Sequence, residues 1–175
     1  MCQGCQNKVV ERAAYRVDHV GSFLRPKELV EAREKFSKGE LSQEELTKVE
    51  DKVITELVEK QIANGLKGVT DGEFRRAYWH LDFFWGLNGV EHVQGEKGYP
   101  FKGIETKPDT AKVSGKISGE NHPFVAHYKF LRDLVADKEG VTVKLTIPSP
   151  SQLYFELIRT EDHIKGYEKF YPTFE

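Results

Sequence analysis

The sequence is poor in cysteine, and this limits the metal and redox chemistry that it can support. Only Cys2 and Cys5 occur, both at the start of the chain. Two thiols supply half of the four ligands of a structural zinc site, and no strand-helix junction surrounds them as in thioredoxin-like motifs. We therefore interpret residues 1–14 as an N-terminal tail with two reduced thiols. A metal or redox role for the pair is the alternative.

Excess charge and long apolar runs are also missing. The chain has 28 acidic and 26 basic side chains, a formal net charge of -2, so the clustered Lys and Arg of a protein that binds nucleic acid or anionic membranes are absent. No apolar run approaches the roughly 20 residues of a membrane span. The first residues lack the apolar stretch of a signal peptide. We expect a cytoplasmic protein that binds neither nucleic acid nor membranes.

What the sequence does contain is enough apolar material for a globular core. Of its 175 residues, 38% are hydrophobic and 11% are aromatic, which excludes disorder. Periodicity and turn residues predict strands over residues 15–20, 66–70, 111–117 and 141–147, with a hairpin or irregular excursion within 88–118. The same signals predict helices over residues 26–39, 42–65, 78–85, 122–134 and 152–159.

The helix over residues 42–65 has the strongest signals. Ser42 and Glu45 have the spacing of a capping box, in which each side chain binds the other's backbone N–H. An apolar stripe follows at helical spacing, and Gly65 is placed as a C-terminal cap. The stripe consists of Leu46, Val49, Val53, Leu57 and Ile62.

Strands alternate with helices along the chain, which indicates an α/β fold with parallel βαβ units. A doubly wound sheet and a (β/α)8 barrel both fit this order. In both folds, functional residues gather where the parallel strands end, at the carboxyl edge of the sheet. We therefore expect the site residues at the predicted strand ends.

Two strand ends carry such residues. Gly21 and Ser22 follow the first predicted strand and precede a helix, where backbone N–H groups can receive a carboxylate or phosphate; the alternative is a simple turn with local hydrogen bonds. Asp71 and Glu73 follow the second strand and could hold an ammonium group or act as acid and base. Alternatively, the carboxylates form a structural ion-pair network with Arg75 and Arg76.

Isolated histidines add little to these predictions. His19 and His80 have no partner at metal-ligand spacing, so we interpret both as hydrogen-bonded structural residues. The segment 148–152 lacks the G-x-S-x-G pattern of a serine nucleophile. We interpret it as a rigid loop that lines a pocket.

Four motifs, in order, resemble the cobalamin-independent methionine synthase family, and most closely its short, single-barrel members. These motifs are Val17–Pro26, Val69–Arg76, Trp79–Phe84 and Thr146–Gln152. The resemblance implies that residues 15–175 are the N-terminal half of a (β/α)8 TIM barrel, about the first four βα units with a hairpin-like excursion. It also implies an enzyme that transfers a methyl group to the thiol of homocysteine.

The resemblance assigns substrate roles to five residues. Gly21 and Ser22 would hold the substrate carboxylate and Glu73 its ammonium group, and His19 and Asp71 are placed in the same substrate-binding group. Asp71 stands where long family members commonly have His. It would either assist Glu73 or pair with Arg75.

The resemblance also implies a zinc ion that activates the homocysteine thiol. In the family, His, Cys and Glu residues of later strands bind the zinc, and no residue of this chain matches those ligand positions. Methyltetrahydrofolate is the methyl donor of the long members. Two alternatives remain open: another barrel enzyme of the superfamily, namely a methyl-cobamide transferase or a porphyrinogen decarboxylase, or a non-catalytic half-barrel. A complete barrel takes about 250 residues, so an open half would expose apolar edges, and we expect the isolated chain to oligomerise or aggregate.

Overall fold

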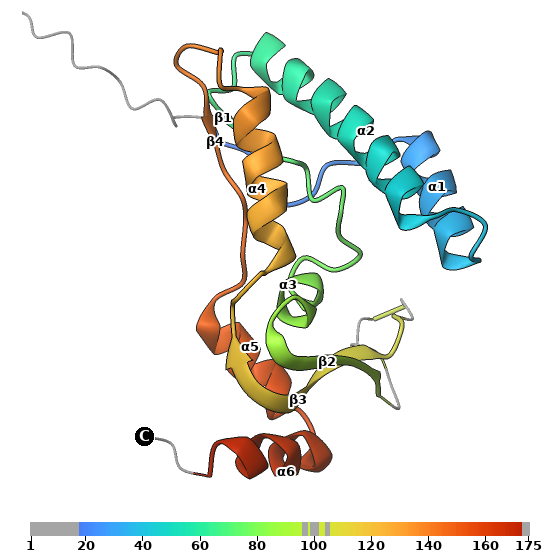
Figure 1. Cartoon of the computed structure of the whole chain (residues 1–175), viewed down its shortest axis with the longest axis vertical. Coiled ribbons are helices and arrows are strands. Elements are labelled where there is room, and N and C mark those ends of the chain that lie inside the picture. The colour runs from blue at the N-terminus through green and yellow to red at the C-terminus, as the bar shows by residue number, and fades with distance from the viewer. Residues whose placement is uncertain (1–17, 96–97, 99–101, 104–105, 173–175) are drawn as a thin grey trace, which may run out of the picture.

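The computed structural model describes residues 18–95, 98, 102–103 and 106–172. The predicted tail over residues 1–14, with Cys2 and Cys5, lies outside the described residues. The rest is a mixed α/β structure of helices and two small sheets (Figure 1). Its elements are α1 (Lys27–Ser37), α2 (Gln43–Ala63), β1 (Gly68–Val69), α3 (Leu81–Trp85), β2 (Asn88–Gln94), β3 (Asp109–Ser118), α4 (Pro123–Leu134), β4 (Thr142–Val143), α5 (Pro150–Leu157) and α6 (Glu161–Phe170).

Helix α2 forms where the sequence predicts it. The Ser42 hydroxyl accepts a hydrogen bond from the backbone N–H of Glu45, and the Glu45 carboxylate accepts one from the backbone N–H of Ser42, so the capping box is confirmed. At the other end, Gly65 has φ +82°. Its N–H donates to Ile62 and that of Leu66 donates to Gln61, which together form a Schellman motif.

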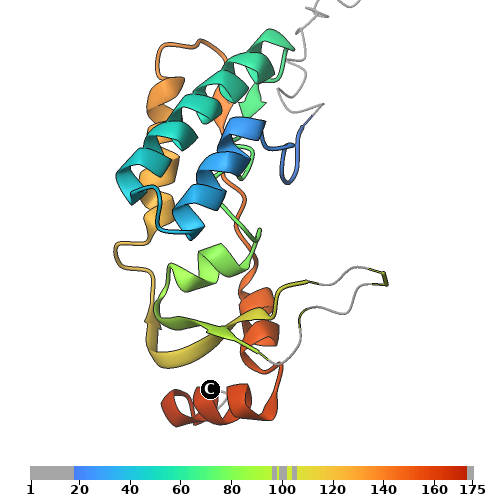
Figure 2. The same ribbon diagram turned by 90° about the vertical axis from the view of Figure 1, so that its right-hand side faces the viewer.

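The first core lies between α1, α2, β1 and α4. Figure 2 shows α1 and α2 side by side. Within α2, Ile54 and Val58 are buried alongside the predicted Val53, whereas Leu57 and Ile62 are only partly buried and pack against the core. The buried members of this core are Leu29, Val53, Ile54, Val58, Val69, Phe74, Leu131 and Val135.

Strands β1 and β4 form a parallel pair beside this core. Gly68 lies opposite Thr142 and Val69 opposite Val143, and the N–H of Lys144 donates to the carbonyl of Val69 over 2.9 Å. Because the strands are parallel, the segments that follow them emerge at the same edge. The sequence predicts both strands, over residues 66–70 and 141–147, and a parallel sheet, but it does not predict that these two strands are neighbours. Each strand is only two residues long.

The second core lies under an antiparallel hairpin. Strands β2 and β3 pair from Asn88–Ser118 to Gln94–Asp109, and α5 and α6 pack against β3 (Figure 1). Its buried residues are Leu81, Phe84, Val90, Ala111, Val113 and Leu157. The expected hairpin within residues 88–118 is therefore present.

The expectation of four successive parallel βα units needs correction. The strand predicted over residues 111–117 pairs antiparallel with β2, so its backbone hydrogen bonds are used within the hairpin. Residues 18–20 of the predicted first strand are not a strand; Lys144 Nζ instead binds the Asp18 carboxylate and, at 2.5 Å, the carbonyl of His19. The described residues show no clear partial (β/α)8 barrel.

Two helix predictions also differ from the structure. The helix predicted over residues 78–85 begins only at Leu81, because the Asp82 carboxylate accepts hydrogen bonds from the N–H groups of Ala77 and Tyr78 and holds them in a turn. Helix α6 was not predicted, although Thr160 caps its N-terminus at His163. Of the described helices, none is both long and apolar enough to cross a membrane.

Candidate functional site

Glu73 has an unusual backbone conformation directly after β1. Its φ is +57°, and that of the preceding Gly72 is +65°. A left-handed φ is uncommon for a residue with a side chain and costs about 1–3 kcal/mol, which the surroundings must stabilise. The Asp71 Oδ1 accepts the Glu73 N–H over 3.0 Å, and Arg25 Nη2 donates to the Glu73 carbonyl over 3.2 Å. Such retained strain is typical of functional sites.

The Glu73 carboxylate joins three segments of the chain that are far apart in sequence. Ser22 Oγ donates to Oε2 over 2.6 Å, and Thr146 Oγ1 donates to Oε1 over 2.9 Å. The Arg76 Nη1 lies 3.7 Å from the same Oε1. Glu73 is 4% exposed, whereas Ser22 beside it is exposed. The carboxylate is therefore buried, and the residue that binds its Oε2 is exposed.

Asp71 supports Glu73 and does not pair with Arg75. Its Oδ1 holds the Glu73 backbone, while its Oδ2 is buried and has no hydrogen-bond partner among the described residues. Burial raises the pKa of the Asp71 carboxyl above its usual range, against the lowering effect of the Glu73 N–H and of Arg76. Of the two roles left open for Asp71, its hydrogen bond favours assistance to Glu73.

The predicted anion-binding segment consists of Gly21 and Ser22, and the Ser22 side chain contacts Glu73. Gly21 has φ +94°, a conformation that glycine adopts without strain. Its carbonyl lies 3.0 Å from His19 Nε2, and the His19 ring stacks on Phe23 at 3.7 Å. Among residues 18–95 and 106–172, neither Gly21 nor Ser22 donates its backbone N–H to another group. Within the described residues, both donors are therefore unused.

Arg75 belongs to a structural ion-pair network, but its partners are not the Asp71 and Glu73 carboxylates that the alternative interpretation names. It binds Glu50 at 3.2 Å and also Asp51, both on α2, and its side chain is 7% exposed. Arg33 binds the same Glu50 at 3.0 Å. This network fixes α1 and α2 to the turn that carries Glu73. It does not include Asp71 or Glu73.

The sequence suggests Arg76 only as an ion-pair partner for the carboxylates, and it suggests no individual role for Thr146. Arg76 is 2% exposed, and its Nη2 donates to the Thr146 carbonyl over 2.7 Å. Thr146 lies after β4, at the edge where β1 also ends. The available signal was its position near the end of the strand predicted over residues 141–147, just before Pro148. Its partner could not be identified without the parallel pairing of β1 and β4.

His80 is buried among aromatic side chains. Its ring lies 4.6 Å from that of Trp79 and 5.9 Å from that of Phe84. Burial lowers the pKa of the His80 imidazole. Within the part of the chain that the structure describes, no group of three or more His, Cys, Asp or Glu side chains could hold a metal ion.

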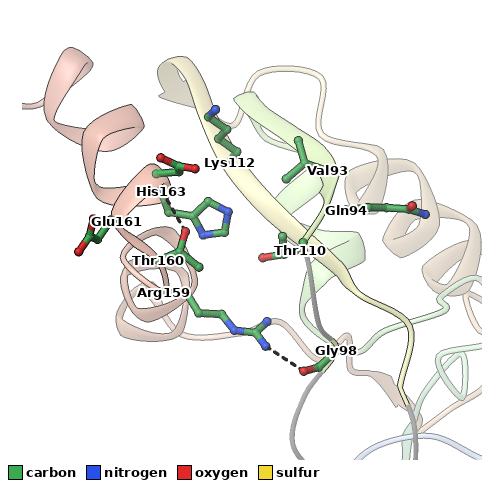
Figure 3. A pocket seen from close by; sticks show the side chains of 11 residues that line it. Val93, Gln94, Gly98, Thr110, Lys112, Arg159, Thr160, Glu161 and His163 are labelled. Carbon is green, nitrogen blue, oxygen red and sulfur yellow. Dashed lines mark hydrogen bonds between the residues drawn. The ribbon is translucent and has the colours of Figure 1, made fainter.

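Two cavities lie outside the Glu73 cluster. The larger, about 790 Å³, lies between β2, β3 and the start of α6, and Figure 3 shows Arg159, Lys112 and His163 around it. It contains two basic side chains but also Glu161 and Asp162. The smaller, about 360 Å³, is largely apolar and is lined by Phe83, Leu87, Gly119, His122, Phe124, Val125, Tyr128, Leu145 and Ile147. None of the five predicted substrate residues lines either cavity.

Comparison with known proteins finds clear relatives of greater length. The chain is 44% identical to the uncharacterized protein YxjH of Bacillus subtilis over 87% of its own length, and 41% identical to YxjG of the same organism over 89%. It spans only 40% of each of these relatives. No protein-family model matches the sequence.

Solved structures resemble the chain as well. A provisionally named vitamin-B12-independent methionine synthase from Listeria monocytogenes matches with a TM-score of 0.65 and 38% identity, over 87% of this chain and 45% of that one. A B12-independent methionine synthase from Shewanella, solved in complex with selenomethionine, matches with a TM-score of 0.52 and 23% identity, over 72% and 36% of the two chains. The second likeness concerns the fold alone.

Proposed function

We propose that this chain is the substrate-anchoring part of a methyltransferase related to the cobalamin-independent methionine synthases, and that it holds the amino-acid end of homocysteine. The observation that carries the proposal is the buried Glu73 carboxylate, which accepts hydrogen bonds from the hydroxyl groups of Ser22 and Thr146. The backbone N–H groups of Gly21 and Ser22, in the segment that supplies one of these hydroxyls, donate to no other described residue. An acceptor and adjacent donors are the groups that an α-amino acid needs for its ammonium and carboxylate. The 38% identity to the Listeria protein supports the same family.

In the proposed complex, the ligand approaches Glu73 from the exposed Ser22 side. Its ammonium group donates to the Glu73 carboxylate, whose oxygens keep lone pairs beyond those used by Ser22 and Thr146. Its carboxylate accepts from the N–H groups of Gly21 and Ser22. His19, through its contact with the Gly21 carbonyl, holds this turn in place. The thiol end would then point away from both charges, toward the methyl donor.

The complete enzyme is proposed to be longer than this chain, since the chain spans 40–45% of the first relatives that it matches. A full (β/α)8 barrel and a cytoplasmic location belong to this proposal. Zinc would lower the pKa of the homocysteine thiol so that the thiolate forms near neutral pH. The described residues offer no ligand cluster for zinc, so its ligands are proposed to lie outside them. Methyltetrahydrofolate is proposed as donor on the resemblance alone.

The contacts of Arg75 and Arg76 favour the methyltransferase over the two alternative barrel enzymes. A porphyrinogen decarboxylase or methyl-cobamide transferase would use Arg75 and Arg76 on substrate carboxylates. Arg75 is instead bound to Glu50 and Asp51, and Arg76 is bound to Thr146. Both guanidinium groups are thus occupied by protein acceptors.

Calorimetric titration of the chain with L-homocysteine tests the proposal. Glu73→Gln removes the charge and keeps the shape, so we expect affinity to fall by roughly tenfold or more. The control variant Glu59→Gln, on the exposed side of α2, should bind as tightly as the parent. Equal affinity of Glu73→Gln and parent would overturn the assignment. A parent chain that binds no homocysteine would overturn the proposed function itself.

A further inference from the structure

We infer that Thr146 is a positioning residue for the Glu73 carboxylate, and that it makes the site select ligands that carry an ammonium group. The inference rests on the proposed function and adds to it a residue of the β4 segment. The Thr146 hydroxyl lies between a buried cation and a buried anion, Arg76 and Glu73.

The direction of the Thr146 hydroxyl proton is fixed by its neighbours. Arg76 Nη1 donates to Thr146 Oγ1 over 3.3 Å, and a guanidinium group cannot accept a hydrogen bond. The hydroxyl must therefore give its own proton to another group, and Glu73 Oε1 lies 2.9 Å away. The same hydroxyl thus accepts from the cation and donates to the anion.

Arg76 holds Thr146 rigidly on its other side. Its Nη2 donates to the Thr146 carbonyl over 2.7 Å and its Nη1 contacts the Trp79 carbonyl at 3.3 Å. The guanidinium carbon lies 4.5 Å from the centre of the Phe124 ring, a favourable cation–π arrangement. A buried and multiply bonded guanidinium gives the Thr146 hydroxyl a fixed place.

The position of Thr146 also limits direct pairing of Arg76 with Glu73. The Arg76 Nη1 is 3.7 Å from Glu73 Oε1, which is longer than the roughly 2.7–2.9 Å of a strong charge-assisted hydrogen bond. Without the hydroxyl, the carboxylate would be drawn toward the guanidinium. A tight pair would satisfy the negative charge internally and leave less of it for a ligand's ammonium group.

Ser22 completes the arrangement on the opposite oxygen. Because Ser22 and Thr146 donate to Oε2 and Oε1 respectively, the plane of the carboxylate is fixed before a ligand arrives. A site that is already ordered does not lose that ordering entropy on binding. The parallel pairing of β1 with β4 brings Thr146 to the edge where Glu73 lies.

The test compares two ligands and three variants by calorimetric titration of the chain. The ligands are L-homocysteine and 4-sulfanylbutanoate, which lacks the ammonium group. We expect Thr146→Val to lower homocysteine affinity by about tenfold, as expected for a lost hydrogen bond to a charged group, and to leave 4-sulfanylbutanoate binding unchanged. Thr146→Ser keeps the hydroxyl and should restore homocysteine binding. Thr142→Val, an exposed threonine in β4, is the matched control.

The outcomes separate this inference from the proposed function. Equal homocysteine affinity of Thr146→Val and parent overturns the inference, and so does an equal loss of both ligands, which would indicate a merely structural residue. If the parent binds no homocysteine, the proposed function fails, and a crystal structure of Thr146→Val decides the positioning role. Closer contact between Glu73 and Arg76 in that structure supports the role; an unmoved carboxylate overturns it.

Discussion

The hydroxyl of Ser22 donates a 2.6 Å hydrogen bond to Oε2 of Glu73, across 51 residues of sequence. This contact connects the segment before α1 to the turn after β1. The N–H of Phe23 supports it by donating to the Gly72 carbonyl over 3.2 Å. The predicted anion-binding segment at Gly21 and Ser22 and the predicted Glu73 carboxylate thus lie together in the structure.

Replacement of Ser22 by alanine tests whether this contact serves ligand binding. The variant loses one of the two hydroxyls that orient the Glu73 carboxylate, while its backbone N–H remains. We expect about tenfold weaker binding of L-homocysteine in calorimetry. Ser114→Ala, at an exposed position of β3, is the control. Unchanged affinity in Ser22→Ala would mean that the hydroxyl has no part in the site.

Gly72→Ala should destabilise the fold strongly. A Cβ at Gly72 would overlap the Leu57 side chain, and the φ of +65° disfavours any side chain. Gly39 has a similar φ of +74° with nothing within 4 Å of its Cβ position, so Gly39→Ala isolates the conformational strain. We expect about 1 kcal/mol of destabilisation for Gly39→Ala and about 1–3 kcal/mol more for Gly72→Ala, in urea unfolding. Similar losses in both variants would contradict the predicted clash.

Asp71→Asn should change how stability depends on pH. Burial raises the pKa of the Asp71 carboxyl in the fold. An ionised Asp71 therefore opposes folding at pH 7, and the penalty disappears as the pH falls through the raised pKa toward the ordinary value. Asparagine keeps the acceptor for the Glu73 N–H. We expect it to equal or exceed the parent in free energy of unfolding at pH 7, with a difference that shrinks toward pH 4. A large loss at pH 7 would show that the charge itself is needed.

His127 should make stability fall in acid. Burial and the nearby Arg75 and Arg76 lower the pKa of its imidazole to about 4. The unfolded chain therefore binds more protons between pH 6.5 and 4, and stability decreases as the pH falls through this range. We expect a contribution on the order of 1–3 kcal/mol, which His127→Gln removes. Urea unfolding at several pH values measures it, and an identical pH profile for parent and variant would refute the prediction.

The isolated chain should self-associate. Leu24 is 97% exposed, Val20 78% and Ile147 60%, and Ile147 borders the apolar 360 Å³ cavity. Exposed apolar surface of this kind favours association. Sedimentation velocity over a range of concentrations should show dimers or larger species. A monodisperse monomer that unfolds cooperatively would count against this expectation.

Local sequence determined those parts of the molecule whose contacts are close along the chain. The capping box of α2 joins Ser42 to Glu45, and its Schellman motif joins Gln61 and Ile62 to Leu66 and Gly65. Gly72 and Asp71 shape the Glu73 turn in the same way, through neighbours one or two residues distant. The interactions of the helix follow from residue type and spacing, so the helix could be predicted; for the turn, the sequence predicts only that Asp71 and Glu73 follow a strand.

Only the tertiary structure decided which strand pairs with which and which side chains meet at Glu73. The strand over Asp109–Ser118 has the same residue pattern whether it joins a parallel sheet or a hairpin, and its pairing with Asn88–Gln94 depends on packing against α5 and α6. Thr146 reaches Glu73 across 73 residues because β4 lies beside β1. Sequence periodicity carries no record of partners at such distances. The sequence therefore indicates Glu73 as a candidate site residue, but it does not indicate that the Thr146 hydroxyl binds the Glu73 carboxylate.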